Sequence, residues 1–295
     1  MTSEANIEDF NKHKPKLMGI AYRMLGSRVE AEDAVQDTCL KWLTADQTAI
    51  DNTEAWLTAV CSRRCLDILK SAYRKRTDYI GPWLPEPVIT EEYIDPLDSR
   101  ILSETLTTAF LLVMERLSPK ERAAYLLREI FETPYADIAP ILNIKETACR
   151  QLVSRAKSTL REKKSRTGVP MHIQQDFIAA FKVAIEEGDL SVLSSMLASD
   201  VCFSADGGGK VPALGRMLEG ITEVSDFISA HLVKFWAGHS WEPAMINSQL
   251  GVILKKDQAI QAIVSVSYGD NEQVKHIYAV RNPDKISQMG FGVLQ

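Results

Sequence analysis

The sequence predicts a multidomain protein with an all-α N-terminal part and an α+β C-terminal part. Apolar residues recur at helical spacing over most of residues 7–166, and a cationic helix-turn-helix pattern occupies residues 133–166. After the helix breaker at 168–170, helices give way to alternating, strand-like runs. Helices followed by several consecutive strands are typical of an α+β domain. The 295 residues are enough for two or three such domains.

Composition favours an ordinary intracellular protein. The net charge of −5 disfavours indiscriminate binding of polyanions, but the cations are concentrated in two segments and form local patches. The cysteines are odd in number and lack the dense spacing of a disulfide scaffold, so we expect reduced thiols. We find neither a signal peptide nor an apolar run of about 18–20 residues. We therefore expect a cytoplasmic protein without a membrane segment.

Two amphipathic helices are predicted first. One runs from Ile7 to Leu25 and ends at Gly26. Ser27 and Glu30 form a capping-box pattern that opens a second helix ending near Leu43. The outer face of this second helix is acidic and contains Glu30, Glu32, Asp33 and Asp37. Charge alone favours a solvated surface for this face.

The third predicted helix is opened by Asp51 with Glu54 and has a basic polar side. Its cations are Arg63, Arg64, Lys70, Arg74, Lys75 and Arg76. Trp56 and Tyr73 add stacking surfaces, and single-stranded nucleic acid is bound by that combination of aromatic platforms and cations. The alternative is a helix end at which the macrodipole favours cations. The residues alone leave both interpretations open.

A linker follows at residues 77–100. Pro82, Pro85 and Pro87 disfavour a helix, and acidic residues dominate the charge, so we expect an extended acidic segment. A flexible tether does not require Trp83 and Leu84, whose large apolar side chains are expected to be buried against another surface. We therefore favour docking of Trp83–Pro87 on a partner surface.

Residues 101–167 are expected to form a second all-α domain. A helix from Ser99 to Leu117 is followed by one that opens at Ser118-Pro119 with Glu121 and ends near Phe131. In the helix-turn-helix, Thr133 is the expected N-cap with Pro134 at the first helical position, and Pro140 should bend the short helix. The second helix, Lys145–Lys164, has an apolar stripe consisting of Ala148, Cys149, Leu152, Val153, Ala156 and Leu160.

The opposite face of Lys145–Lys164 could read a major groove. It contains Glu146, Thr147, Arg150, Gln151, Ser154, Arg155, Lys157, Ser158 and Arg161. Side chains of these kinds reach base edges and phosphates when a recognition helix enters the groove. The alternative is an ordinary amphipathic helix pair with a cationic rim.

The C-terminal domain, residues 171–295, is expected to begin with helices Ile173–Glu187 and Leu190–Leu197. A strand at Val201–Ser204, a glycine loop and a helix at Ile221–Phe235 come next. The remaining expected strands are Glu242–Gln249, Leu250–Lys255, Gln258–Tyr268 and Glu272–Arg281. These elements predict helices packed on a long antiparallel sheet.

Catalytic and metal sites are not favoured. Cys61 and Cys65 are four residues apart, but no nearby histidine or cysteine completes four ligands, so core packing is favoured. Asp206–Lys210 lacks the glycine and lysine spacing of a phosphate-binding loop. An enzyme would use Asp206, His231, His239 or His276 as acid or base, but none has an evident orienting partner. We expect no catalytic residue, cofactor or metal.

Residues 1–166 resemble the extracytoplasmic-function (ECF) sigma factors of bacterial RNA polymerase. The resemblance rests on YRMLGSRVEAEDAVQDTCLKWL, then AWLTAVCSRRCLDILKSAYRKR, then a linker and a helical unit ending in the helix-turn-helix. It implies that Asp33, Gln36 and Asp37 bind core RNA polymerase. It places Asn52, Trp56, Arg63 and Arg64 near the −10 promoter element, which this part melts. Lys70 and Arg74 of the same cationic face are also expected to bind DNA. It places Arg150, Gln151 and Ser154 on the −35 element, and Arg155 of the same face is also expected to bind DNA.

Three short motifs carry a narrower resemblance, to the group 41 sigma factors. The motifs are Trp83-Leu84-Pro85-Glu86-Pro87, Asp206-Gly207-Gly208-Gly209-Lys210 and Asn282-Pro283-Asp284-Lys285-Ile286, the last with isoleucine where leucine is usual. That group has a fused SnoaL-like C-terminal domain of the nuclear-transport-factor-2-like fold, with a cone-shaped sheet wrapped on helices. The resemblance implies intramolecular regulation through these motifs. We predict that they meet at one interface.

The resulting expectation is a sigma factor without chemistry of its own. It would have a region 2 domain at 1–76, the linker at 77–100, a region 4 domain at 101–167 and the regulatory domain at 171–295. Its partners would be core RNA polymerase and promoter DNA, with no membrane, and a small-molecule ligand of the C-terminal domain is left open. Two alternatives are a one-component helix-turn-helix regulator with a ligand-sensing domain and a SnoaL-like enzyme fused to a DNA-binding module.

Overall fold

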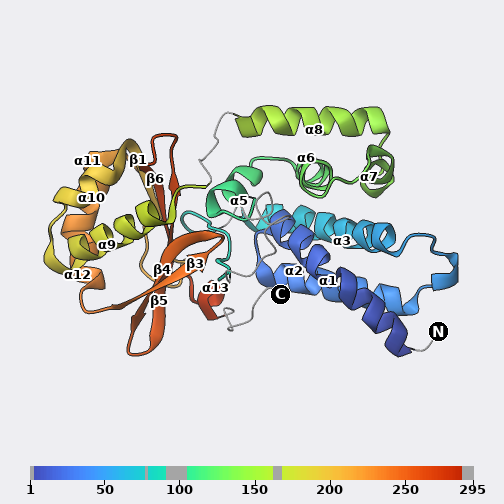
Figure 1. Ribbon diagram of the computed structural model, residues 1–295, viewed down its shortest axis with the longest axis horizontal. Helices are drawn as coiled ribbons and strands as arrows, with labels where there is room; N and C mark the ends of the chain where they lie inside the picture. The colour runs from blue at the N-terminus through green and yellow to red at the C-terminus, as the bar shows by residue number, and fades with distance from the viewer. Residues whose placement is uncertain (1–2, 77–78, 91–104, 162–167, 288–295) are drawn as a thin grey trace. The chain divides into compact units, whose positions relative to one another are not determined.

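The computed structural model describes residues 3–76, 79–90, 105–161 and 168–287 (Figure 1). The described residues divide into two compact units. We call residues 3–76 with 111–161 the helical unit, and residues 79–90 and 105–110 with 168–287 the sheet unit. The expected combination of helical N-terminal parts with an α+β C-terminal part is confirmed. No helix of the described ranges is both long and apolar enough to cross a bilayer.

The helical unit begins with three helices that pack on one another: α1 (Ser3–Leu25), α2 (Arg28–Thr44) and α3 (Thr53–Arg76). A 3-10 turn, η1 (Gln47–Ala49), lies between α2 and α3. Ser27 caps α2 as expected, since its hydroxyl accepts from the Glu30 N–H at 3.2 Å. The expectation that Asp51 opens α3 was wrong by one residue. The Asn52 side chain caps the helix instead, accepting from the Ala55 N–H at 3.0 Å.

The rest of the helical unit contains the helix-turn-helix. Its elements are α5 (Thr108–Met114), which begins in the sheet unit, α6 (Pro119–Tyr125), the π-turn η2 (Leu126–Ile130), α7 (Tyr135–Leu142) and α8 (Glu146–Arg161). The capping box of Ser118 and Glu121 is present at the start of α6. Helix α8 spans most of the range expected for it, and residues 162–164 lie outside the described residues.

Two helix starts in this part differ from expectation. Residues 105–107 form a turn, so the described helix begins at Thr108 and not at Ser99, which itself lies outside the described residues. The Thr107 hydroxyl accepts from the Phe110 N–H at 3.2 Å and stabilises this later start. Thr133 does not cap α7. Pro134, with extended backbone (φ −60°, ψ 145°), occupies the N-cap position without a side-chain hydrogen bond.

The sheet unit is built on a six-stranded sheet in the order β2-β1-β6-β5-β4-β3. The strands are β1 (Leu197–Asp206), β2 (Leu218–Glu219), β3 (Ser240–Ile246), β4 (Gln249–Lys256), β5 (Ala259–Tyr268) and β6 (Val274–Val280). The expected all-antiparallel sheet was wrong at one pair, because β1 and β6 run parallel, with Phe203 beside Ile277. Helices and four other strands connect these two, so no hairpin dictates an antiparallel direction.

The core of the sheet unit also contains four helices and a π-turn. They are α9 (Met171–Glu187), α10 (Ser191–Met196), α11 (Ile221–Phe227), the π-turn η3 (Ile228–Leu232) and α12 (Val233–Trp236). Helix α9 packs on β4 and α11 packs on β1 (Figure 1). Phe177, Phe181 and Trp236 are almost fully buried there. Strand β2 and a last short helix, α13 (Pro283–Ser287), were not expected from the sequence.

The linker is extended over residues 79–90, as expected. Ile89 forms an isolated antiparallel bridge with Ile246 of β3. The buried side chain of Asn247 anchors the same segment, since Oδ1 accepts from the Val88 N–H at 3.1 Å and Nδ2 donates to the Leu106 carbonyl at 3.0 Å. The linker acids at 78, 91, 92, 95 and 98 lie outside the residues whose side chains are described. The described part of the linker is therefore an integral part of the sheet unit.

Candidate nucleic-acid interface and linker-docking site

Helix α8 presents the predicted reading face to solvent. Cys149, Val153 and Ala156 are buried on its inner side. The four residues of this helix predicted to bind DNA are all exposed: Arg150, Gln151, Ser154 and Arg155. The amphipathic division expected from the spacing is therefore present in the fold, and contact with DNA remains a prediction.

Arg150 is held in place before any DNA contact. Its guanidinium lies 4.3 Å from the centroid of the Tyr135 ring on α7 and 3.2 Å from the Glu146 carboxylate. Arg155 pairs more loosely with Glu121, at 3.4 Å. Exposed pairs of this kind contribute about 0–1 kcal/mol, so phosphates or bases could replace these partners at little cost.

The basic face of α3 is less free than expected. The Arg63 guanidinium donates to the Pro140 carbonyl of α7 at 3.1 Å, and Arg64 pairs with Asp37 of α2 at 2.6 Å. This second contact joins a residue predicted to bind DNA to one predicted to bind polymerase. Lys70 pairs with Asp67 at 3.0 Å. Several predicted binding residues thus have intramolecular partners in this structure.

The other predicted residues of α2 and α3 differ in exposure. Asp33 and Gln36 are exposed and Asp37 is half-buried. Trp56 is half-buried against Trp42, with ring centroids 5.7 Å apart. The side chain of Arg74 lies outside the described residues.

A buried arginine that sequence reasoning missed connects α6 to α1. Arg122 is 3% exposed, and its Nη1 donates to the Met24 carbonyl and to Glu115, each at 2.7 Å. Burial lowers the pKa of Arg122 to about 10. Arg122 lies one helical turn before the apolar pair Leu126 and Leu127 and therefore on the same face of the helix. This spacing was the only feature of the sequence that indicated an inward-facing side chain.

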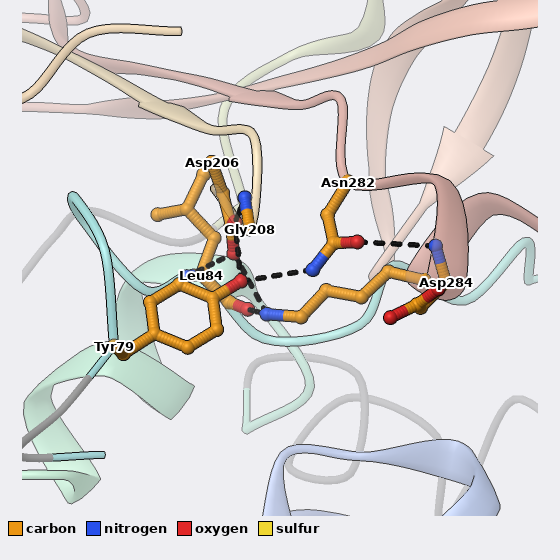
Figure 2. Close-up of polar contacts among 7 residues, drawn as sticks. Tyr79, Leu84, Asp206, Gly208, Asn282 and Asp284 are labelled. Carbon is orange, nitrogen blue, oxygen red and sulfur yellow. Dashed lines mark hydrogen bonds and ion pairs between the residues drawn. The ribbon is translucent and has the colours of Figure 1, made fainter. Parts of the chain in front are cut away.

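The linker-docking site is centred on Asp206, at the end of β1. Its side chain is completely buried. Oδ1 accepts from the Tyr79 hydroxyl at 2.6 Å and from the Gly208 N–H at 3.0 Å, and Oδ2 accepts from the Leu84 N–H at 2.9 Å (Figure 2). The carboxylate is therefore fully engaged as a structural acceptor, which argues against its use as a catalytic base.

Lys285 of α13 supplies the charge that compensates this carboxylate. Its Nζ lies 2.7 Å from Asp206 Oδ2 and also donates to the Leu84 carbonyl. The same ammonium lies 4.5 Å from the Trp83 ring centroid and 5.3 Å from that of Tyr79. Lys285 is only 7% exposed, so the two charges form a buried pair, and Tyr79 and Leu84 of the linker contribute polar contacts to it.

Asn282 completes the polar cluster. Its Nδ2 donates to the Tyr79 hydroxyl at 2.9 Å, and its Oδ1 accepts from the Asp284 N–H at 3.0 Å (Figure 2). Burial, followed by the hydrogen bond to Asp206, raises the pKa of Tyr79 above its usual range. Tyr79 therefore remains a neutral donor at physiological pH.

The three consecutive glycines allow backbone to approach closely. A Cβ on Gly207 would lie 2.5 Å from the Val211 carbonyl oxygen, and one on Gly209 would lie 2.9 Å from Ile80. Gly208 has a φ of +62°, and a Cβ there would overlap the Asn282 amide. Only glycine fits at this turn.

We expect Gly208→Ala to destabilise the sheet unit more than Gly188→Ala. Both glycines have positive φ, but a Cβ at Gly188 would meet nothing within 4 Å. Each change costs about 1–2 kcal/mol for the left-handed backbone, and overlap with Asn282 adds about 1–3 kcal/mol. Urea unfolding of the two variants would measure the difference, and equal losses would contradict the overlap argument.

The structure brings together the three motifs that the sequence singled out. Trp83 and Leu84 contact Lys285, and Asp206 contacts both the linker and α13. The exposed pair of Lys210 and Asp284 joins the two other motifs at 2.7 Å. In the remainder of the motifs, Pro85 and Pro87 are buried, Glu86 is half-buried and Pro283 is exposed. The sequence did not indicate Tyr79 or Asn247, because one hydroxyl or amide in a loop forms no pattern.

The three histidines among the remaining catalytic and metal candidates belong to different segments of the fold. His239 is buried, His276 stacks on Tyr278, and His231 contacts Phe227. Within the described ranges, no three His, Cys, Asp or Glu side chains are grouped as a metal site would require. Cys61 and Cys65 are both completely buried as free thiols.

Comparison with known proteins agrees with this geometry. Residues 10–76 match the Sigma-70 region 2 family and residues 107–160 match the Sigma-70, region 4 family. The ECF RNA polymerase sigma factor SigJ of Mycobacterium tuberculosis is 33% identical over 292 residues, covering 95% of this chain and 93% of the relative. The probable ECF sigma factor SigI of the same species is 34% identical over 205 residues, covering 69% of this chain and 70% of SigI.

A solved structure extends the similarity to the C-terminal part. The crystal structure of M. tuberculosis SigJ superimposes with a TM-score of 0.76 at 33% identity, covering 95% of this chain and 98% of that one. The six-stranded α+β unit is therefore shared, consistent with a fused SnoaL-like domain. Sigma-70 regions in the expected order, and similarity over nearly the whole length of SigJ, show that this chain belongs to the ECF RNA polymerase sigma factors.

Proposed function

We propose that this sigma factor is regulated by its own C-terminal domain, which holds the linker between regions 2 and 4. One observation carries the proposal: the buried pair of Asp206 and Lys285 binds both backbone polar groups of Leu84. Asp206 accepts from the Leu84 N–H, and Lys285 donates to its carbonyl. The Leu84 side chain is 1% exposed, so this part of the linker is clamped on all sides.

Tethering makes such a clamp effective. Because the linker and the sheet belong to one chain, docking is intramolecular, and short connections give effective concentrations of about millimolar. Even weak docking would therefore keep the linker bound until another interaction competes for it. Asn247 anchors the same segment further along, at Val88 and Leu106.

As a sigma factor, the chain binds core RNA polymerase and promoter DNA. We assign polymerase binding to Asp33, Gln36 and Asp37, the −10 element to the α3 face and the −35 element to the α8 face. The intramolecular pair of Arg64 and Asp37 is 40% and 42% exposed, so exchanging it for intermolecular contacts costs little. We assign region 2 to residues 1–76, the linker to 77–100, region 4 to 101–167 and the regulatory domain to 171–295. We also propose that the chain acts without catalysing a reaction.

The location follows from the partner. Since bacterial RNA polymerase works on chromosomal DNA, we propose that the chain acts in the cytoplasm.

Transcription by reconstituted polymerase tests the clamp. We expect Trp83→Ala to change the amount of transcript several-fold, because it removes the ring beside Lys285 from the docked linker. Val192→Ala is the control, since Val192 is an apolar side chain of the same unit that is 60% exposed. Hydrogen exchange at the Leu84 N–H reports independently whether the linker is released. A released linker with unchanged transcription would refute regulation through this site.

Arg150→Ala tests the assignment of α8. If Arg150 makes a bidentate contact with a base, its loss should weaken discrimination at that −35 position by roughly 1–3 kcal/mol. Holoenzyme binding to promoters that differ at single −35 positions would measure this. An equal loss on every sequence would assign Arg150 to a phosphate instead.

A further inference from the structure

The sheet unit contains a cavity of about 210 Å³ that the sigma-factor function does not use. It lies between the sheet and the segment that runs from α11 to α12, and the stretch Pro212–Leu214 also lines it. The side chains that matter for its chemistry are Phe203, Phe227, His231, Phe235, Trp236 and Arg281. The walls are mostly apolar and include four Phe and Trp rings, with His231 and Arg281 as the polar side chains, which is typical of small-molecule sites.

Two N–H donors in this wall lack acceptors. Within the part of the chain that the structure describes, neither Trp236 Nε1 nor Arg281 Nε has a hydrogen-bond partner, and both atoms are buried. Trp236 itself is only 1% exposed, so water does not readily serve it. A buried, unsatisfied donor costs about 1–3 kcal/mol. Both atoms are covered in this structure, so an acceptor in the cavity would reach them only after a small side-chain rotation.

Arg281 also supplies a positive charge. Its guanidinium is 4.3 Å from the Phe235 ring centroid and donates to the Pro212 carbonyl, which fixes its position at the cavity wall. Burial lowers the pKa of Arg281, as expected for a cation that has lost water without gaining an anion. Among the described residues, no aspartate or glutamate forms an ion pair with it. The site therefore favours an anion.

We propose that this cavity binds a small aromatic carboxylate. The ring lies beside the Phe and Trp rings of the wall, and the carboxylate accepts from the Arg281 guanidinium. The size fits, because an apolar cavity of about 150 Å³ takes up benzene, and 210 Å³ leaves room for a short acidic substituent. The ligand site differs from the linker-docking site, so the proposal does not depend on regulation through Asp206.

Calorimetric titration of the full-length chain with phenylacetate tests the proposal. We expect saturable binding of one molecule per chain at micromolar to millimolar concentrations. Arg281→Met should weaken phenylacetate binding at least tenfold, or about 1.4 kcal/mol. The same variant should change binding of the neutral analogue phenylacetamide much less, because only the carboxylate needs the guanidinium.

A second variant tests the cavity independently, in case Arg281→Met loses binding only because it misfolds. Ala213 is exposed and lines the cavity, so Ala213→Trp should block it without disturbing the core. Ala237→Trp is the matched control, since Ala237 is exposed but does not line the cavity. Ala213→Trp should abolish binding and Ala237→Trp should retain it, with thermal unfolding showing that both are folded. Absence of saturable binding to the unaltered chain, or full binding by both Arg281→Met and Ala213→Trp, would overturn the proposal.

Discussion

Replacing Lys285 with alanine should lower the free energy of unfolding of the sheet unit by about 3–5 kcal/mol. The variant leaves the Asp206 carboxylate completely buried without its cation and leaves the Leu84 carbonyl without its donor. Burial of an unpaired charge costs far more than loss of the contact itself. Urea unfolding followed by tryptophan fluorescence would measure the loss, and Leu84 should exchange its amide hydrogen faster.

Lys210→Ala is the matched control for this prediction. Lys210 pairs with Asp284 in the same cluster, but the two side chains are 55% and 64% exposed. Such a pair contributes at most about 1 kcal/mol. A double variant, Asp206→Asn with Lys285→Met, removes both charges and should be less destabilised than Lys285→Ala alone. Similar losses for Lys285→Ala and Lys210→Ala would show that the buried pair is not the anchor.

Arg122→Ala should destabilise the helical unit by a similar amount, about 3–5 kcal/mol. The change leaves the Met24 carbonyl without the Arg122 donor and removes one ion-pair partner of Glu115, which is 22% exposed. Because Arg122 joins α6 to the end of α1, hydrogen exchange should increase in both helices. Arg116→Ala serves as the control, since Arg116 is exposed and lies on the same segment. An Arg122 variant as stable as the Arg116 variant would contradict the role of this contact.

Helices were predictable because their signal is local. The apolar stripe of α8 follows from spacing within one helix, and the structure has Cys149 and Val153 buried as expected. The caps were less predictable. Asn52 and not Asp51 caps α3, and Pro134 takes the place expected for Thr133, because the backbone dihedrals around the cap decide between neighbouring residues.

Contacts between distant segments were the hardest to predict. The parallel pairing of β1 with β6 depends on the whole intervening chain, and no local pattern encodes it. The contact between the linker and the sheet unit was predicted because the three motifs occur together in a known family. Their spacing along the chain does not by itself indicate that they are close in space. The Tyr79 hydroxyl donates to Asp206 across 127 positions, and the half-burial of Arg281 at the cavity wall is evident only in three dimensions.

The clamp on the linker can form only late in translation of the chain. Leu84 and Lys285 are 201 positions apart, and both DNA-binding regions lie before Lys285 in the sequence. At a synthesis rate of about 5–20 residues per second, the ribosome needs roughly 10–40 s to travel that distance. Regions 2 and 4 therefore emerge before α13 exists, and each new molecule begins life with its linker unclamped.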